Sequence, residues 1–347
     1  SLDVASRKAL WANLKNHQLG WWIIIFCLKK EYIYDISKIK KELIMKTEKI
    51  KINSKVDNLE IECLLVIPDE EIKGIIQIAH GMNEHKERYL DFMGFLAQNG
   101  YVCIINDHRG HGNSIKEKDD IGYFYDNNAE YVVEDLNQIT EYITKKFKDK
   151  KIILFGHSMG SMIVRKYMEK YDDKIDGLIV CGSPSENKLA KLGLFFIKLL
   201  EGIKGERYRS KFIRNLMFNG YDKENEIKNS WICYNEEIVK KYKEDPLCQY
   251  EYTLNGMENI VKLMIDIYNP KLYQKKNLNL PIYFIAGKDD PVIVSEEKWN
   301  EAQNFLRNIG YREIQNKLYE NMRHEILNEK ENQKVYEDIL KWITNLK

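Results

Sequence analysis

Short apolar runs that alternate with helical patterns constrain the fold of this chain more than any other feature of its sequence. Several runs are followed by apolar residues at helical spacing, as in Arg88–Asn99, Asn128–Phe147 and Met159–Tyr171. Most runs lack the alternation of apolar and polar residues that is typical of a strand with one face exposed to solvent. This favours strands that are buried on both faces. The pattern predicts an α/β fold in which helices flank a mostly parallel sheet. The six expected strands are Leu59–Ile67, Gly74–Ala79, Tyr101–Asn106, Lys151–Phe155, Leu178–Cys181 and Pro281–Ala286.

The regular alternation stops between Cys181 and Pro281. Helix-like sequence fills this interval, including "LGLFFIKLLEGIKG" (192–205) and "ENIVKLMIDIYN" (258–269). Loops without secondary structure of their own are rarely longer than about 15 residues. We therefore predict a helical insertion, residues 183–280, between two strands of the sheet.

One stretch, "GHSMG" at positions 156–160, joins an expected strand directly to an expected helix. In a G-x-S-x-G turn of this kind the serine takes a strained backbone conformation, and its neighbours must be small because strand and helix almost collide. Such a turn displays the Ser158 hydroxyl at the positive end of the helix, where developing negative charge is favoured. We interpret Ser158 as a candidate nucleophile, against the alternative of a structural glycine-rich turn.

A serine hydroxyl is a weak nucleophile unless a base removes its proton. After a turn of this type the partners follow along the chain as an acid and then a histidine. The chain has seven histidines, and His324 is the one that follows Ser158. Asp289 and Asp290 lie between them, directly after the apolar run "PIYFIAG", at the end of a strand where α/β enzymes place their chemistry. The residues themselves do not decide which aspartate would orient the imidazole.

Five motifs in a fixed order give the chain a wider resemblance. They are "HGMNEHKERY" (80–89), "DHRGHGNS" (107–114), "GHSMGS" (156–161), "GKDDPV" (287–292) and "MRHEILNE" (322–329). With these motifs the chain resembles the α/β-hydrolase superfamily, in particular its monoacylglycerol lipase and lysophospholipase branch, over residues 50–347. The resemblance implies an α/β-hydrolase fold with a core of residues 45–182 and 281–347, a helical lid of residues 183–280, and an N-terminal extension of residues 1–44.

The resemblance also implies roles for individual residues. The acid of the family is the last residue of a G-x-x-D pattern, which here is Asp290. The backbone N–H groups of Met82 and Met159 would form the oxyanion hole. Together with Ser158 and His324, these groups would make the chain a serine hydrolase that cleaves carboxylic esters through an acyl-enzyme, and no cofactor is needed.

The implied lid is rich in apolar residues, which suits a fatty acyl chain. We therefore predict a small-molecule ester substrate that contains an acyl chain, a monoacylglycerol or a lysophospholipid. The alternative is that these residues only pack the lid onto the core. They are Leu194, Phe195, Phe196, Leu199, Leu200, Phe212, Met217, Phe218 and Met264.

A second function stays open, because aminopeptidases that remove N-terminal residues share this fold and its serine turn. Such enzymes need an acidic anchor in the lid for the amine of the substrate. The candidates for that anchor are Glu201, Glu206 and Glu236.

Composition argues against several other classes of function. The net charge of +1 gives no electrostatic attraction toward nucleic acid. The six cysteines show no C-x-x-C spacing, so they give no sign of a metal site or of redox chemistry. This pattern favours a reducing, cytoplasmic location. No carboxylate or cysteine accompanies His108 and His111 at ligand spacing, so no metal site is predicted. The sequence does not specify an oligomeric state.

The segment "LGWWIIIFCLKK" (19–30) lies in the N-terminal extension. Its apolar stretch is too short to span a bilayer, and it lacks the basic start and cleavage site of a signal peptide. Paired tryptophans and two lysines are elements of an interfacial anchor, which would give peripheral membrane contact through residues 19–30. Because the apolar residues are contiguous rather than striped, we favour burial against protein, or a stretch not native to the enzyme, over the membrane anchor.

Overall fold

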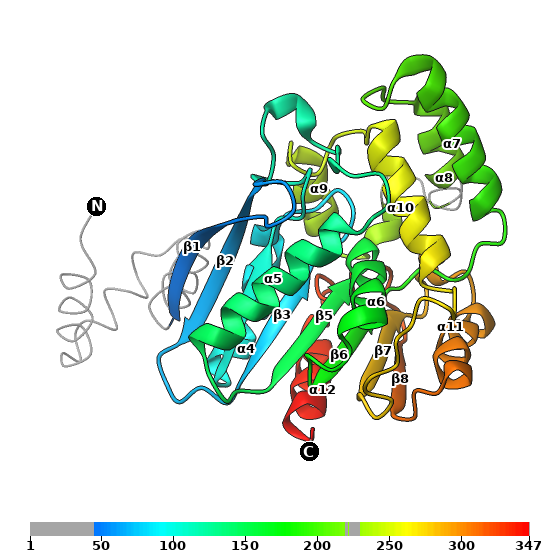
Figure 1. Ribbon diagram of the computed structural model, residues 1–347. Coiled ribbons are helices and arrows are strands. Elements are labelled where there is room, and N and C mark those ends of the chain that lie inside the picture. The colour runs from blue at the N-terminus through cyan, green and yellow to red at the C-terminus, as the bar shows by residue number, and fades with distance from the viewer. Residues whose placement is uncertain (1–44, 219–220, 222–229, 347) are drawn as a thin grey trace, which may run out of the picture. The chain divides into compact units, whose positions relative to one another are not determined.

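Eight strands form one sheet in the part of the chain that the structure describes (Figure 1). The structure is a computed structural model, and it describes residues 45–218, 221 and 230–346. Along the sheet the strands lie in the order β1-β2-β4-β3-β5-β6-β7-β8. Their bounds are β1 (Met45–Asn53), β2 (Glu60–Pro68), β3 (Gly74–Ala79), β4 (Tyr101–Asn106), β5 (Ile152–His157), β6 (Gly177–Cys181), β7 (Ile282–Gly287) and β8 (Ile314–Tyr319).

The direction of the strands places several loops at one edge of the sheet. All neighbouring pairs from β4 to β8 are parallel, with Ile75 of β3 opposite Ile152 of β5, for example. In contrast, β2 runs antiparallel to β4. The prediction of a mostly parallel sheet is therefore confirmed. The carboxyl ends of β3, β5, β6, β7 and β8 meet at the same edge, where this class of fold binds its ligands.

All six predicted strands are present, with ends that differ from the prediction by at most two residues. The sequence analysis missed β1 and β8, which end the strand order at either side of the sheet. Both strands carry exposed polar side chains, such as Lys49 and Lys51 in β1 and Gln315 and Asn316 in β8. Such polar residues protect an edge strand from pairing with other chains. Because the strand carries them, its sequence shows no apolar run.

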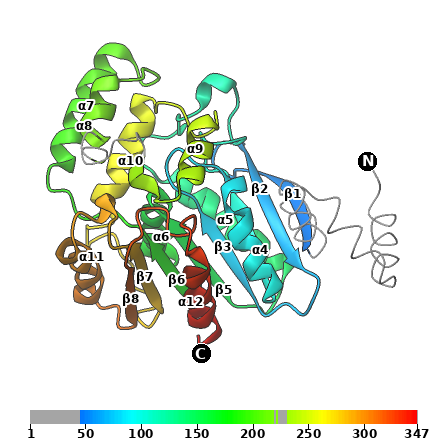
Figure 2. The same cartoon turned by 180° about the vertical axis from the view of Figure 1, so that it is seen from behind.

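Helices cover both faces of the sheet (Figures 1 and 2). One face is covered by α4 (Leu90–Gln98) and α12 (Asn332–Thr344), and the other by α5 (Tyr131–Lys146) and α6 (Met159–Tyr171). With both faces covered, β3 to β7 are buried along their whole length. A further helix, α11 (Glu296–Ile309), lies beside β7 and β8. The short 3₁₀ helices of the core are η1 (Lys86–Tyr89), η2 (Lys118–Asp120) and η4 (Pro291–Ile293).

Two of the three predicted helices differ from the structure at their N-terminal ends. The predicted helix from Arg88 is divided into η1 and α4. The predicted helix from Asn128 begins at Tyr131, because the carboxylate of Asp126 accepts the backbone N–H groups of Glu130 and Tyr131, each at 2.9 Å. A side-chain acceptor at this place satisfies N–H groups that the first turn leaves unpaired.

The interval between β6 and β7 is helical, as the sequence pattern predicted. Its elements are α7 (Ala190–Lys204), α8 (Lys211–Phe218), η3 (Ser230–Ile232), α9 (Glu236–Glu244) and α10 (Leu254–Asp266). We call residues 183–280 the insertion. The division of the chain into core, lid and extension stays a prediction.

No helix among the described residues is long and apolar enough to cross a membrane. The predicted contact segment, residues 19–30, lies outside the described residues.

The close approach of α6 to the sheet generates a stability prediction. A Cβ atom at Gly160 would lie 2.0 Å from the carbonyl oxygen of Ala79, whereas a Cβ atom at Gly193 in α7 would meet nothing within 4 Å. Gly160→Ala should therefore lower the free energy of unfolding by about 1–3 kcal/mol or more, as overpacking does. Gly193→Ala, the control, should raise it by about 0.5–1 kcal/mol, because glycine weakens a helix interior. Urea unfolding of the two variants measures both, and equal effects would contradict the packing argument.

Candidate active site

Ser158 stands at the junction of β5 and α6 in a strained conformation. Its φ of 53° and ψ of −118° lie in a region that residues other than glycine rarely adopt. The Ser158 N–H donates to the carbonyl of Cys181 at the end of β6, at 2.9 Å. A Cβ atom at Gly156 would lie 2.4 Å from the Gly160 carbonyl oxygen, so the turn requires small residues on both sides of the serine. The predicted strand-turn-helix arrangement is therefore present.

His324 and Asp290 form a buried pair at the ends of β8 and β7. His324 Nδ1 and Asp290 Oδ2 are 2.9 Å apart, and each residue is 3% exposed. The other carboxylate oxygen of Asp290 accepts the N–H of Val292 at 2.8 Å, which fixes the orientation of the carboxylate. Asp289 is exposed and accepts a hydrogen bond from Tyr234 instead. The structure thus brings Asp290, and not Asp289, to His324.

His157 connects this pair to the serine turn. Its Nε2 lies 3.1 Å from the backbone carbonyl oxygen of His324, and the two imidazole rings have centroids 4.6 Å apart. Because His157 directly precedes Ser158, this contact links the backbone of His324 to the segment that carries the nucleophile candidate. The Ser158 side chain is half-buried, and its hydroxyl has no hydrogen-bond partner among the described residues.

The loop after β3 lies against the serine. A Cβ atom at Gly81 would lie 3.0 Å from the Cβ of Ser158. In this loop the Gly81 N–H donates to Glu84 Oε1 and the Asn83 N–H donates to the hydroxyl of Tyr252, each at 3.0 Å. Between them, the Met82 N–H has no acceptor within the described part of the chain. The same holds for the N–H of Met159 at the start of α6, so both amides are available to an external acceptor.

Charged residues are buried directly behind this edge of the sheet. Glu84 accepts from Arg88 at 2.8 Å and lies 3.0 Å from His157 Nδ1. Arg88 also makes a bidentate ion pair with Glu325, the residue after His324, at 2.7 and 2.8 Å. Burial disfavours the charged form of Glu84, but Arg88 and His157 outweigh it and lower the pKa of Glu84 to about 2. For His157, burial is likewise outweighed by the Glu84 carboxylate, and its pKa is raised. A protonated His157 can donate from both ring nitrogens, to Glu84 and to the His324 carbonyl.

The insertion contacts two of the loops that carry the candidate residues. Tyr252 binds the loop after β3 through Asn83, as described above. In the loop after β8, the Glu325 N–H donates to the carbonyl of Ile232 in η3 at 2.7 Å. The ring of Trp231 lies beside the imidazole of His324, with centroids 5.2 Å apart. The position of the insertion is therefore coupled to the position of the candidate residues.

His80, His108 and His111 form a buried cluster below the Met82 loop. His80 Nδ1 donates to the Gly81 carbonyl at 2.8 Å, and its Nε2 accepts the backbone N–H of His108 at 3.1 Å. Burial, together with the neighbouring imidazole of His111, lowers the pKa of His108 to about 3, and burial lowers the pKa of His111 to about 4. These neutral rings serve as hydrogen-bonding groups that support the loop.

Sequence reasoning missed the supporting residues Glu84, Arg88, His157 and Glu325. All four lie inside motifs that the sequence analysis quoted, but a charged residue in a motif gives no sign of which loop it binds. The pairs Arg88–Glu325 and His157–His324 join residues more than 160 positions apart, and only the fold brings them together.

The chain is similar to several known proteins. The profile of the family described as serine aminopeptidase S33 matches residues 70–331. A monoacylglycerol lipase of Mycolicibacterium smegmatis is 24% identical over 288 residues, covering 80% of this chain and 90% of that protein. A monoglyceride lipase homolog of monkeypox virus is 26% identical over 299 residues, with 84% and 96% covered.

A solved structure extends the comparison to the fold. The thermostable carboxyl esterase of Bacillus coagulans, determined in complex with glycerol, superposes with a TM-score of 0.80 at 28% identity, over 87% of this chain and 99% of the esterase. The α/β-hydrolase fold implied by the motifs is thereby confirmed. The family profile matches well more than half of the length of this chain. The chain therefore belongs to the S33 serine aminopeptidase family of α/β-hydrolases.

Proposed function

We propose that this chain hydrolyses carboxylic esters, with Ser158 as nucleophile, His324 as general base and Asp290 as the acid that orients the histidine. The observation that carries the proposal is the buried 2.9 Å hydrogen bond between His324 Nδ1 and Asp290 Oδ2, which His157 links to the turn of Ser158, a serine with a φ of 53°. A carboxylate bound to the Nδ1–H holds the tautomer whose Nε2 can accept the serine proton. The names of the relatives, monoacylglycerol lipase and carboxyl esterase, support an ester as the substrate.

In the first step, Ser158 Oγ attacks the ester carbonyl carbon while His324 Nε2 takes the hydroxyl proton. Negative charge then develops on the carbonyl oxygen. The amides of Met82 and Met159, which have no acceptor among the described residues, are the proposed donors to that oxygen. As the tetrahedral intermediate collapses, His324 gives its proton to the departing alcohol and the acyl group stays on Ser158.

In the second step, a water molecule attacks the acyl-enzyme, and His324 removes its proton as it does so. The second intermediate uses the same two amides and collapses to the free acid, and the proton returns to Ser158. Every proton transfer has its donor and acceptor in this chain, the ester or the attacking water, so the proposed reaction needs no cofactor.

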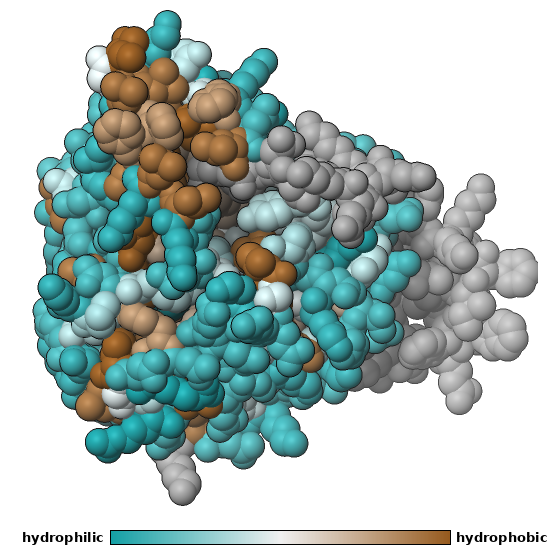
Figure 3. Space-filling model, turned by 90° about the vertical axis from the view of Figure 1, so that its right-hand side faces the viewer, coloured by the Kyte–Doolittle hydropathy of each residue, from teal (hydrophilic) through white to brown (hydrophobic). Residues whose placement is uncertain are grey.

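The outer surface of the insertion supports a lipid-like ester. Figure 3 shows apolar side chains gathered over α7 and α8. Of the nine apolar residues named in the sequence analysis, four are between 43% and 68% exposed and are not explained by packing onto the core: Phe195, Phe196, Leu199 and Phe212. Monomeric proteins rarely expose large contiguous apolar surfaces unless these bind something. We therefore keep a monoacylglycerol or lysophospholipid as the proposed substrate.

Other apolar residues of the insertion named in the sequence analysis pack onto the core, as the alternative explanation predicted. Leu194, Leu200 and Met264 are partly buried against the core. The side chains of Met217 and Phe218 lie outside the described part of the chain.

The aminopeptidase alternative finds less support in the insertion, although the family carries that description. Glu206 accepts the hydroxyl of Tyr123 at 2.6 Å, and Glu236 is exposed at the start of α9. Burial and the neighbouring carboxylate of Glu258 raise the pKa of Glu201 to about 7, so Glu201 is only partly charged at neutral pH. A cationic amine needs an ionised carboxylate that pairs with it next to the reacting carbonyl, and none of the three candidates is shown to provide one, so an ester is the better supported substrate.

A cytoplasmic location remains part of the proposal. All five cysteines in the described residues are free and buried, which suits a reducing compartment. Peripheral membrane contact through residues 19–30 stays a separate proposal, which deletion of residues 1–44 and co-sedimentation with liposomes would test.

A panel of substrates tests the proposed function. Each methylene that the enzyme buries contributes about 0.8 kcal/mol, or roughly fourfold in kcat/KM. The kcat/KM of p-nitrophenyl esters should therefore rise over several carbons from acetyl toward decanoyl, and aminoacyl amides should be poor substrates. A flat or falling ester profile, with faster turnover of aminoacyl amides, would favour the aminopeptidase.

The two adjacent aspartates provide a matched pair of variants. Asp290→Asn should lower kcat on the order of 10⁴-fold, because the amide no longer holds the required tautomer of His324. Asp289→Asn removes an exposed carboxylate and should change kcat by less than about threefold. Steady-state kinetics with one ester measures both, and the reverse order of effects would transfer the role to Asp289.

The Glu84 network predicts a pH-dependent contribution to stability. The pKa of Glu84 lies near 2 in the folded chain against 4.5 ordinarily, so its ionisation stabilises the fold above pH 4.5 and that contribution is lost as the pH falls toward 2. Because the pKa of His157 itself depends on Glu84, the effect of Glu84→Gln is measured in a His157→Gln background, where the carboxylate still pairs with Arg88. In that background Glu84→Gln removes one titration, so the difference in unfolding free energy between the chains with and without Glu84 should narrow as the pH falls from 6 to 3.5. Exposed Glu117→Gln controls for the loss of one carboxylate. Parallel curves for the chains with and without Glu84→Gln would contradict the prediction.

A further inference from the structure

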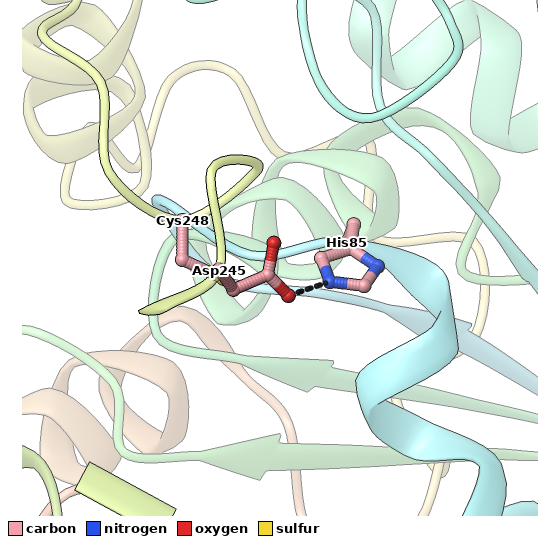
Figure 4. Close-up of side chains that lie close together, drawn as sticks. All are labelled: His85, Asp245 and Cys248. Carbon is pink, nitrogen blue, oxygen red and sulfur yellow. Dashed lines mark hydrogen bonds and ion pairs between the residues drawn. The ribbon is translucent and has the colours of Figure 1, made fainter. Parts of the chain in front are cut away.

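A second cluster of chemically active side chains lies outside the candidate active site, where the insertion meets η1. His85 directly precedes η1, and Asp245 and Cys248 lie on the turn that follows α9 (Figure 4). One nitrogen, one oxygen and one sulfur atom from these three residues lie within 4.8 Å of one another. His85 precedes Asp245 by 160 positions and Cys248 by 163, so sequence spacing gives no sign of the cluster.

The turn presents two of these side chains in a fixed arrangement. The Cys248 N–H donates to the Asp245 carbonyl at 3.0 Å, which closes the turn. Asp245 Oδ1 accepts the N–H of Leu247 at 2.9 Å, so the carboxylate is oriented and its other oxygen, Oδ2, is directed at His85. The Cys248 thiol is buried and has no hydrogen-bond partner within the described part of the chain.

His85 is oriented as metal-binding histidines usually are. Its Nδ1 lies 2.8 Å from a carboxylate oxygen of Glu87, and its Nε2 lies 2.8 Å from Asp245 Oδ2. A carboxylate on one ring nitrogen fixes the imidazole and increases the basicity of the other nitrogen, which is the common arrangement behind a metal-ligating histidine. Here Glu87 takes that supporting position and Nε2 faces the other two ligand atoms.

We propose that His85, Asp245 and Cys248 form a three-ligand binding site for a divalent transition-metal ion, with Zn²⁺ as the best match. Imidazole, carboxylate and thiolate together are a donor set that zinc accepts and that Ca²⁺ and Mg²⁺ do not. Zinc bonds of about 2.0–2.3 Å in tetrahedral geometry hold ligand atoms roughly 3.3–3.7 Å apart, so movements of about an ångström would complete the site. The carboxylate and the thiolate would balance the charge of the ion.

The surroundings of the three side chains leave room for a fourth ligand and for the metal ion to enter from solvent. The Asp245 side chain is 30% exposed, whereas Cys248 is 2% exposed, so the site opens to solvent on the aspartate side. Zinc would replace the proton shared by His85 and Asp245 and release that of Cys248, with water in the fourth position. The bound ion would join the insertion to His85, which lies directly before η1 and three residues beyond Met82.

Cobalt binding to the full-length chain tests the site, because a Co²⁺–thiolate bond gives a charge-transfer absorption band. The wild type, stripped with a chelator, should bind one Co²⁺ per chain with this band, and Zn²⁺ should displace it and raise Tm. Cys248→Ser should abolish the band, while Cys233→Ser, which changes another buried cysteine of the insertion, should keep it. Glu87→Gln should weaken Zn²⁺ binding by about 10–100-fold in a competition titration.

Several outcomes would overturn the proposal. A band that persists in Cys248→Ser but disappears in Cys27→Ser would assign the binding to the N-terminal residues. Absence of binding by a wild type that unfolds cooperatively would leave His85 and Asp245 as an ion pair only. Cooperative thermal unfolding of each apo variant, followed by circular dichroism, ensures that a lost band does not reflect a lost fold.

Discussion

The close contact between α6 and the end of β3 is the constraint on which the rest of the site depends. At Gly160 the helix approaches Ala79 so closely that no side chain fits between them. The contact forces Ser158 into its strained turn and also brings the loop that carries Met82 against the serine. One packing requirement thereby places both the proposed nucleophile and one of the proposed oxyanion donors.

Buried charges then hold the loops that this contact brings together. A buried ion pair is costly unless every partner is also hydrogen-bonded. Here Glu84 binds the backbone of Gly81, and His157 binds the backbone of His324, so the charged groups support the loops after β3 and β8 directly. The insertion adds contacts to the same loops through Tyr252 and Ile232. A substrate that moves the insertion would therefore affect the geometry of the site, not only access to it.

The sequence allowed much of this arrangement to be predicted, because order along the chain carries information in this fold. Ser158 could be predicted as the candidate nucleophile from the steric demands of its turn, and His324 as the candidate base by elimination. Asp290 could be distinguished from Asp289 by the family pattern. The physical reason became visible only in the structure: the carboxylate of Asp290 is buried and caps η4, whereas Asp289 is exposed. The sequence analysis did not predict the edge strands β1 and β8, because polar edge residues form no apolar run. It also did not predict the cluster of His85, Asp245 and Cys248, because contacts between distant residues leave no local pattern.

The identity of the residue that a serine-directed phosphonate modifies tests the central claim most directly. The reagent resembles the tetrahedral intermediate and bonds to an activated serine, so peptide mass spectrometry should find one adduct, on Ser158, with parallel loss of esterase activity. Ser158→Ala should be unlabelled, with kcat lower by roughly a million-fold if the three residues act as a unit. An adduct on another residue, or undiminished turnover by Ser158→Ala, would contradict the account.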